Sequence, residues 1–208
     1  MLVGLGVGVL ALGGWAYDEF LKPSAAAKQL ELTERPWVRV DLQIAGPLVV
    51  DKYGMNVSIL ATTRTTGNSP ATSVMMESRM YVDYAWPATR INATREAFCA
   101  DVKKRALINQ QFLRSLFPGT PELPEYQQLG VPKDMLQEAM KGDNSGRVIP
   151  IIMTCAVYRS TFNDTLYETA YESTIMSVEQ GQGMSVPAAE GTVIPSTRLF
   201  ITTETHVD

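Results

Sequence analysis

The chain has few of the residues that most enzymes use for catalysis. Its 208 residues include two cysteines, Cys99 and Cys155, and a single histidine, His206, close to the C-terminus. Neither cysteine has a histidine near it in the sequence, and a cysteine nucleophile needs such a base. The sequence has no CxxC motif and no pair of histidines, which excludes the common zinc motifs. We therefore predict no catalytic residues, no metal site and no cofactor.

The chain also lacks a strong charge of either sign. Its net charge is −4, and its lysines and arginines are scattered along the sequence. A nucleic-acid-binding surface would show a basic stripe, so we expect no nucleic-acid partner. The densest basic run, Lys103-Lys104-Arg105, is interpreted as the solvated face of a helix.

A long uncharged stretch is present at the N-terminus. Residues 1–17, MLVGLGVGVLALGGWAY, end in Trp15 and Tyr17, residue types that favour a membrane interface. A helix of this length spans about 25 Å, slightly less than a hydrocarbon core of about 30 Å. We predict a single transmembrane anchor over residues 1–21, followed by a polar linker over residues 22–35. A cleaved signal peptide is the alternative, but the basic segment that normally begins one is absent.

Small residues in this anchor predict a helix-packing face. Gly4 and Gly8 form a GxxxG pair, and Ala11 extends the surface of small residues. Small residues let two helix backbones approach closely in lipid. We predict that Gly4, Gly8 and Ala11 contact transmembrane helices of other subunits, while Trp15 and Tyr17 lie at the interface of the lipid bilayer. The alternative is that glycine is simply frequent in membrane helices.

Strand patterns dominate the rest of the chain, and residues 148–178 are its central stretch. They predict two strands joined at residues 162–165. The first strand is almost continuously apolar, as expected of a strand that is covered on both faces. The second strand alternates between two sets of residues, which indicates that one face is covered and the other exposed. One set is Tyr167, Thr169, Tyr171, Ser173 and Ile175, and the other is Glu168, Ala170, Glu172, Thr174 and Met176. Further strands are predicted at residues 38–44, about 55–65, about 72–83 and 197–205.

The apolar period becomes helical over residues 92–116. Phe98, Val102 and Ala106 recur at helical spacing, the pattern continues to Leu113 and Leu116, and Asn92 or Thr94 is a suitable N-cap. A second short helix is predicted over residues 132–140. We therefore predict one mainly β domain over residues 36–208, an immunoglobulin-like antiparallel β-sandwich with a helical insertion at about 93–142.

Four segments resemble, in the same order, an uncharacterised family of bacterial membrane-anchored proteins. The segments are TTGNSPATSV (65–74), SLFPGT (115–120), VIPIIMTCAVYRSTFNDT (148–165) and VPAAEGTVI (186–194). The resemblance implies one N-terminal transmembrane helix in the bacterial inner membrane and a β-sandwich domain in the periplasm. It implies no activity, because the family has none assigned.

The two cysteines are predicted to form a disulfide. Cys99 lies on the predicted helix and Cys155 on the central strand, so a bond between them would fix the inserted helix to the sheet. Disulfides persist in oxidising compartments such as the periplasm. The alternative is a pair of buried thiols in the cytoplasm, and Lys22 and Lys28 after the apolar segment favour that orientation.

Two functional hypotheses follow from these features. The first is a non-catalytic accessory subunit that docks on a larger bacterial membrane complex, such as a respiratory or photosynthetic assembly, through its transmembrane helix and its sandwich. The second is an anchored periplasmic module that binds a small molecule, sugar or peptide, and it predicts a concave apolar pocket. Tyr158, Tyr167 and Tyr171 on the central strands are interpreted as packing residues rather than as the lining of that pocket.

Overall fold

The computed structural model describes residue 29 and residues 35–84, 89–108, 113–120, 124–142, 145–162, 165–178 and 184–207. The chain divides into two compact units, residues 1–35 and 36–208. The predicted anchor lies outside the described residues, and so do Gly4, Gly8, Ala11, Trp15 and Tyr17. Within the described ranges, no helix is long and apolar enough to cross a membrane. The transmembrane anchor therefore stays a prediction.

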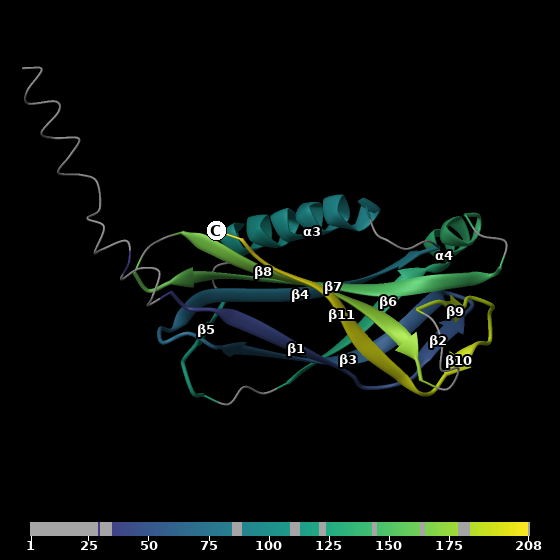
Figure 1. The fold of residues 1–208 in the computed structure, drawn as a ribbon, viewed down its shortest axis with the longest axis horizontal. Helices are drawn as coiled ribbons and strands as arrows, with labels where there is room; N and C mark the ends of the chain where they lie inside the picture. The colour runs from purple at the N-terminus through teal and green to yellow at the C-terminus, as the bar shows by residue number, and fades with distance from the viewer. Residues whose placement is uncertain are drawn as a thin grey trace, which may run out of the picture. The chain divides into compact units, whose positions relative to one another are not determined.

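Strands dominate the second unit, and the described part contains eleven of them together with two helices (Figure 1). In chain order they are β1 (Val38–Ile44), β2 (Leu48–Asp51), β3 (Gly54–Thr65), β4 (Ala71–Asp83), α3 (Thr89–Ile108), β5 (Arg114–Leu116), β6 (Glu125–Pro132), α4 (Lys133–Met140), β7 (Arg147–Ser160), β8 (Leu166–Ser177), β9 (Val186–Pro187), β10 (Val193–Ile194) and β11 (Thr197–Val207). The prediction of a mainly β unit is confirmed.

Two antiparallel sheets make up this unit. In the first, β3 pairs with β1 and β2 and also with β6, while β10 extends the sheet beyond β2. The second has the order β11-β8-β7-β4-β5, and β9 pairs with the first residues of β7. The two sheets pack face to face as a sandwich, because each of two buried clusters between them takes side chains from both sheets.

The alternating pattern of β3 explains how the first sheet faces the second. Met55, Val57, Ile59 and Ala61 are all buried, whereas the residues between them are only partly buried. Successive side chains of a strand point to opposite faces, so one face of β3 is apolar along its length. That face packs toward the second sheet, and the burial of each large side chain contributes roughly 1.5–3 kcal/mol.

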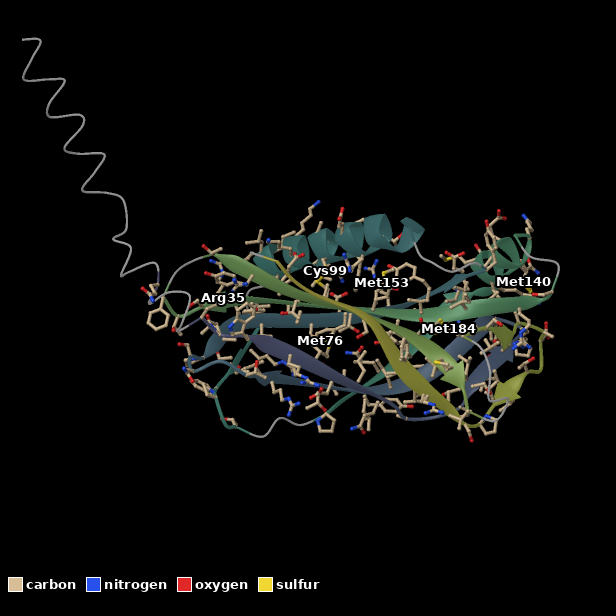
Figure 2. All side chains as sticks on the ribbon, viewed as in Figure 1. Arg35, Met76, Cys99, Met140, Met153 and Met184 are labelled. Atoms are coloured by element: carbon tan, nitrogen blue, oxygen red, sulfur yellow. A yellow bond between two sulfur atoms is a disulfide. The ribbon has the colours of Figure 1, made fainter. Side chains whose placement is uncertain are left out.

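Helix α3 forms a third layer on the other face of the second sheet (Figure 1). Its buried residues Phe98, Cys99, Val102 and Ala106 pack against alternate residues of β7, which are Ile149, Ile151, Met153, Cys155 and Val157. Figure 2 shows Cys99 and Met153 between the helix and the sheet, and Met76 between the two sheets. Strand β7 is therefore covered on both faces, as its continuous apolar run predicts.

The prediction for the second strand of the central hairpin is wrong in one respect. Its alternation indicates a half-exposed strand, but on the face of β8 that should be exposed Ala170, Glu172 and Thr174 are all buried. The cause is α3, which packs over this part of the sheet and contacts β8 as well as β7. The sequence pattern of one strand does not reveal that a distant helix covers it.

The segment predicted as a helical insertion contains strands as well as helices. Helix α3 begins at Thr89, before the predicted caps Asn92 and Thr94, and ends at Ile108. Leu113 and Leu116 therefore do not continue the helix, and Leu116 lies in β5 opposite Ala71 of β4. Strand β6 pairs with β3 in the first sheet, whereas α4 occupies Lys133–Met140, close to its predicted range.

Candidate functional site

A groove of about 550 Å³ lies between α3 and α4, over the last residues of β4. Its lining combines apolar and aromatic side chains with polar ones, and the exposed surface is almost equally polar and apolar. The residues that line it are Tyr81, Val82, Asp83, Tyr84, Thr94, Met135, Glu138, Ala139, Lys141, Gly142, Ile151 and Met153. A concave surface of this size that combines apolar and polar groups is typical of a binding site.

The floor and the walls of the groove come from different elements. Ile151 and Met153 of β7 form part of the floor, and both are almost fully buried. On the α4 side, Leu136 points into the core between the sheets and fixes the helix there. Met135 and Ala139 of the same helix then line the groove. The amphipathic character of α4 thus places one side in the core and leaves another side facing the groove.

Tyr84 and Gly142 meet at the rim. A Cβ atom at position 142 would overlap the Tyr84 ring, so only glycine lets the ring lie against the backbone there. The Tyr84 side chain is 41% exposed and that of Met135 is 48% exposed. Two large, partly apolar side chains are therefore presented to solvent at the edge of the groove.

The acidic side chains at the rim already have partners. Asp83 accepts a hydrogen bond from the backbone N–H of Tyr84 at 2.7 Å. Glu138 forms an ion pair with Lys141, with 2.6 Å between Oε2 and Nζ. Each carboxylate can accept further hydrogen bonds, so the groove offers a ligand polar groups as well as apolar surface.

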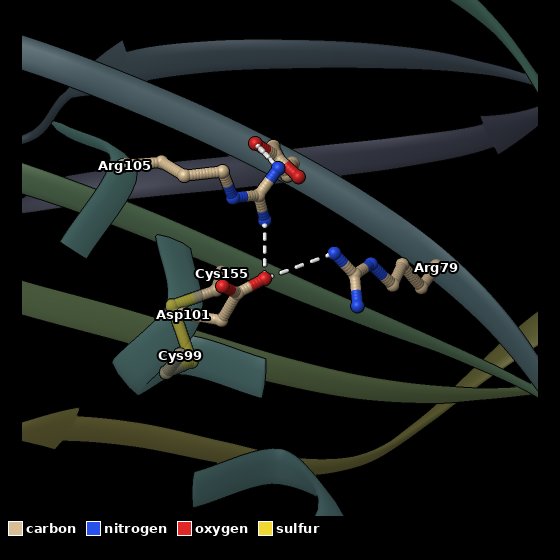
Figure 3. Close-up of polar contacts among 6 residues, drawn as sticks. Arg79, Cys99, Asp101, Arg105 and Cys155 are labelled. Carbon is tan, nitrogen blue, oxygen red and sulfur yellow. Dashed lines mark hydrogen bonds and ion pairs between the residues drawn. A yellow bond between two sulfur atoms is a disulfide. The ribbon is translucent and has the colours of Figure 1, made fainter. Parts of the chain in front are cut away.

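The two cysteines lie together beneath α3, as predicted. Cys99 and Cys155 are at disulfide distance, with their Cα atoms 5.6 Å apart, and both side chains are buried. Figure 3 shows this pair beside a chain of ion pairs between the helix and the sheet. The cysteine pair fixes the middle of α3 over the centre of β7, and the same helix contributes Thr94 to the lining of the groove.

Ion pairs join α3 to β4 beside the cysteines. Asp101 contacts Arg79 and Arg105, each with an N–O distance of 3.1 Å, and Arg105 also contacts Glu77 (Figure 3). All four side chains are partly exposed, so each ion pair contributes at most about 1 kcal/mol. They set the direction of α3 along β4 more than they stabilise the unit.

The other candidate residues from the sequence do not contribute to the groove. Tyr158, Tyr167 and Tyr171 are buried between the sheets, where the rings of Tyr158 and Tyr167 lie 5.9 Å apart, so their interpretation as packing residues is confirmed. His206 lies in β11, where it pairs with Thr169 of β8. Among the described residues, no group of three or more His, Cys, Asp or Glu side chains could hold a metal ion.

Sequence reasoning missed the groove because its residues are distant in the chain. Tyr84 follows β4 and Met135 lies in α4, and no spacing in the sequence relates the two. No motif in the sequence marks either position as part of a binding surface.

Comparison with known proteins gives no match to a family model, to a curated protein or to a solved structure. The resemblance to a bacterial membrane-anchored family therefore stays a prediction.

Proposed function

We propose that this chain is a membrane-anchored, non-catalytic accessory subunit that holds an apolar segment of a partner protein in the groove between α3 and α4. The groove itself is the observation that carries this proposal, because it is a concave, partly apolar surface on a domain with few catalytic side chains. The proposal joins the two functional hypotheses from the sequence, since the binding surface is also the means of docking on a complex.

The strand order supports an immunoglobulin-like domain. Strands β1, β3 and β6 are adjacent in one sheet, as strands A, B and E are in immunoglobulin domains. Strands β5, β4, β7 and β8 are adjacent in the other, which corresponds to C′, C, F and G. In this scheme α3 is an insertion between C and C′, and β11 is an added strand beyond G. Domains of this class commonly bind partner proteins through residues at one end of the sandwich.

Two exposed side chains at the rim favour a polypeptide as the occupant of the groove. A polypeptide can bring apolar side chains to Met135 and Tyr84 and backbone groups to the polar residues of the lining. Met135 at the rim is flexible and polarizable, and methionine is frequent at surfaces that accept varied apolar partners. Tyr84 adds a rigid aromatic face with a polar tip, as is common at protein interfaces.

The cellular location is part of the proposal. The apolar segment over residues 1–17 supports an anchor in the bacterial inner membrane. Two cysteines at disulfide distance support an oxidising compartment, and we infer that they are bonded and that the domain lies in the periplasm. The partners in this proposal are the lipid bilayer and the subunits of a membrane complex.

Substitution of Met135 tests the groove. Met135→Lys in the full-length protein should lower the amount of co-purified partner subunits in mild detergent by tenfold or more, because a charge at the rim would have to be desolvated on binding. Val193→Lys is the matched control, since Val193 is an exposed apolar residue away from the groove. Equal co-purification with both variants would contradict the proposal. A tightly bound small molecule in the purified protein, detected by mass spectrometry, would instead favour the small-molecule module.

A further inference from the structure

The two ends of the sandwich differ in their exposed side chains. At one end, Leu116 of β5 and Ser160 of β7 both pair with Ala71 at the start of β4. Phe117 and Phe162 follow directly beyond this row, and their side chains are 56% and 59% exposed. Two phenylalanines therefore project from the same end of the second sheet.

The chain enters the domain at this same end. Trp37, just before β1, accepts a hydrogen bond through its carbonyl oxygen from the backbone N–H of Thr66 at 2.7 Å. Thr66 follows β3 and precedes the start of β4 at Ala71. The polypeptide that leads from the apolar segment 1–17 is thus joined to the domain beside the end that carries Phe117 and Phe162.

Helix α3 ends toward the same side. Arg79 contacts Asp101, and Glu77 contacts Arg105, so the helix runs antiparallel to β4 and its last residues lie toward the start of that strand. Its last residue, Ile108, is 70% exposed.

Basic and apolar side chains are combined in the last turns of this helix. Lys103 and Lys104 precede Leu107 and Ile108 by three to five residues, and residues three or four apart on a helix are neighbours on its surface. Leu107 is exposed, as is Ile108. Neither lysine has an ion pair with another described residue.

The opposite end carries both basic and acidic side chains. It exposes Tyr53 and Val193, and its three lysines are Lys52, which lies over the Tyr53 ring, and Lys133 and Lys141, which form ion pairs with glutamates. The acidic side chains at this end are Asp51, Asp83, Asp134, Glu138 and Glu190. An anionic membrane surface attracts lysines and repels carboxylates, so the ion pairs of Lys133 and Lys141 weaken that attraction, whereas Lys103 and Lys104 at the first end have no such ion pairs with described residues.

We propose that the first end rests on the surface of an anionic bilayer. We call it the basal end and define it by Leu107, Ile108, Phe117 and Phe162 together with Lys103 and Lys104. Its apolar side chains would insert at the boundary of headgroups and acyl chains, while the lysines attract anionic lipid. This proposal rests on the membrane anchor of the proposed function, because a tethered domain meets the bilayer at a high effective concentration, which makes a weak contact sufficient.

The proposal also orients the groove. Residues 18–35 would span up to roughly 60 Å if fully extended, so the length of the connection alone does not select either end of the domain. The exposed apolar side chains and the lysines of the basal end favour that end as the one that contacts the membrane. With the basal end on the membrane, the groove beside Tyr84 and Met135 lies at the far end of β4 and faces partners away from the lipid.

The test uses the full-length protein in liposomes that contain anionic lipid and a nitroxide-labelled lipid. Phe162→Cys carries an environment-sensitive fluorophore, and Tyr53→Cys at the opposite end is the matched control; the native cysteines are buried and stay paired under non-reducing conditions. We expect a blue shift of the emission and nitroxide quenching at position 162 but not at position 53. Equal quenching at both positions, or none at either, overturns the proposal. A blue shift without quenching also overturns it, because that result reports burial against protein.

Two further measurements separate the parts of the proposal. Flotation of the liposomes after an alkaline wash tests the anchor alone: protein that fails to float refutes the anchor, whereas protein that floats with an unquenched Phe162→Cys label refutes only the basal contact. Lys103→Glu/Lys104→Glu should abolish quenching at position 162, since it replaces attraction to anionic lipid by repulsion. Quenching that persists in this variant overturns the electrostatic part.

Discussion

Tyr158 fills a position in the core, but its hydroxyl oxygen is buried without a hydrogen bond to the described residues. Its side chain is fully buried between the sheets and its ring packs near that of Tyr167. A buried hydroxyl without a partner lowers stability by about 1–3 kcal/mol, whereas the ring itself contributes strongly to the packing.

Removal of that hydroxyl should therefore not weaken the protein. We expect Tyr158→Phe to leave the free energy of unfolding unchanged or to raise it by about 1 kcal/mol. Tyr158→Ala should lower it by about 3–5 kcal/mol, because it leaves a cavity in the core. Urea denaturation of the full-length protein in mild detergent, without reductant, measures both changes. A clear loss of stability in Tyr158→Phe would mean that the hydroxyl group is hydrogen-bonded.

At the residue scale the sequence predicts buried positions well in strands whose apolar and polar residues alternate and that are covered on one face only. Val57 and Ile59 of β3 are buried as their pattern indicates. Ala170 of β8 is buried although its pattern indicates exposure, because it packs in the cluster between α3 and the sheet. The apolar period of a strand shows which of its faces packs on the neighbouring sheet. It does not show whether a helix also covers the other face.

Helix α3 is held on the sheet by apolar packing, by ion pairs and by the cysteine pair. Phe98 and Val102 supply the apolar packing, and the ion pairs of Asp101 are too exposed to contribute much. Cys99 and Cys155 are separated by 56 positions in the sequence, so a bond between them restrains a large loop of the unfolded chain. Replacement of both cysteines by alanine removes this bond and deletes only one sulfur atom from each side chain.

Loss of the bond should measurably destabilise the unit. In the chain-entropy model, a disulfide that closes a loop of this length stabilises the folded state by about 4 kcal/mol. We expect Cys99→Ala/Cys155→Ala to lower the melting temperature, and a reductant to lower that of the wild type but not that of the variant. Titration of thiols in the denatured, unreduced wild-type protein should find none. Two titrating thiols would show that the cysteines are not bonded.

At the element scale the long strands and both helices are predictable, and the short strands are not. Strands β1, β3, β4, β7, β8 and β11 lie close to their predicted ranges. Strand β6 lies inside the predicted helical insertion, and only two of its eight residues, Leu129 and Val131, are buried, so its apolar alternation is short. Strands β2, β9 and β10 have two to four residues each, too few to establish a period.

The proposed function of the whole molecule depends on the predicted anchor. Replacement of Gly4 and Gly8 by leucine keeps the segment apolar but separates it from any neighbouring helix, because the larger side chains hold the backbones apart. We expect Gly4→Leu/Gly8→Leu to insert in the membrane and to fold normally but to lose its partner subunits in a pull-down. Gly13→Leu/Gly14→Leu, beside Trp15, is the control and should lose less.

A normal pull-down with Gly4→Leu/Gly8→Leu would show that the segment is only a tether. The partner would then be held by the groove alone, and Met135→Lys would remain the decisive variant. At this scale the sequence predicts two units and their chemical character. It cannot predict the groove, because Tyr84 and Met135 are brought together only when β4 and α4 take their places in the fold.

The pairing of β4 with β7 also determines when the domain can fold during synthesis. Ala71 pairs with Ser160, so these central strands of the second sheet are joined across about 90 residues of chain. Helix α3 is translated before β7, the strand on which most of its apolar face packs. Contacts between distant segments form slowly because a large loop must first be closed. Strand β4 and α3 therefore cannot complete their packing until β7 is available, which places the closure of the second sheet late in folding.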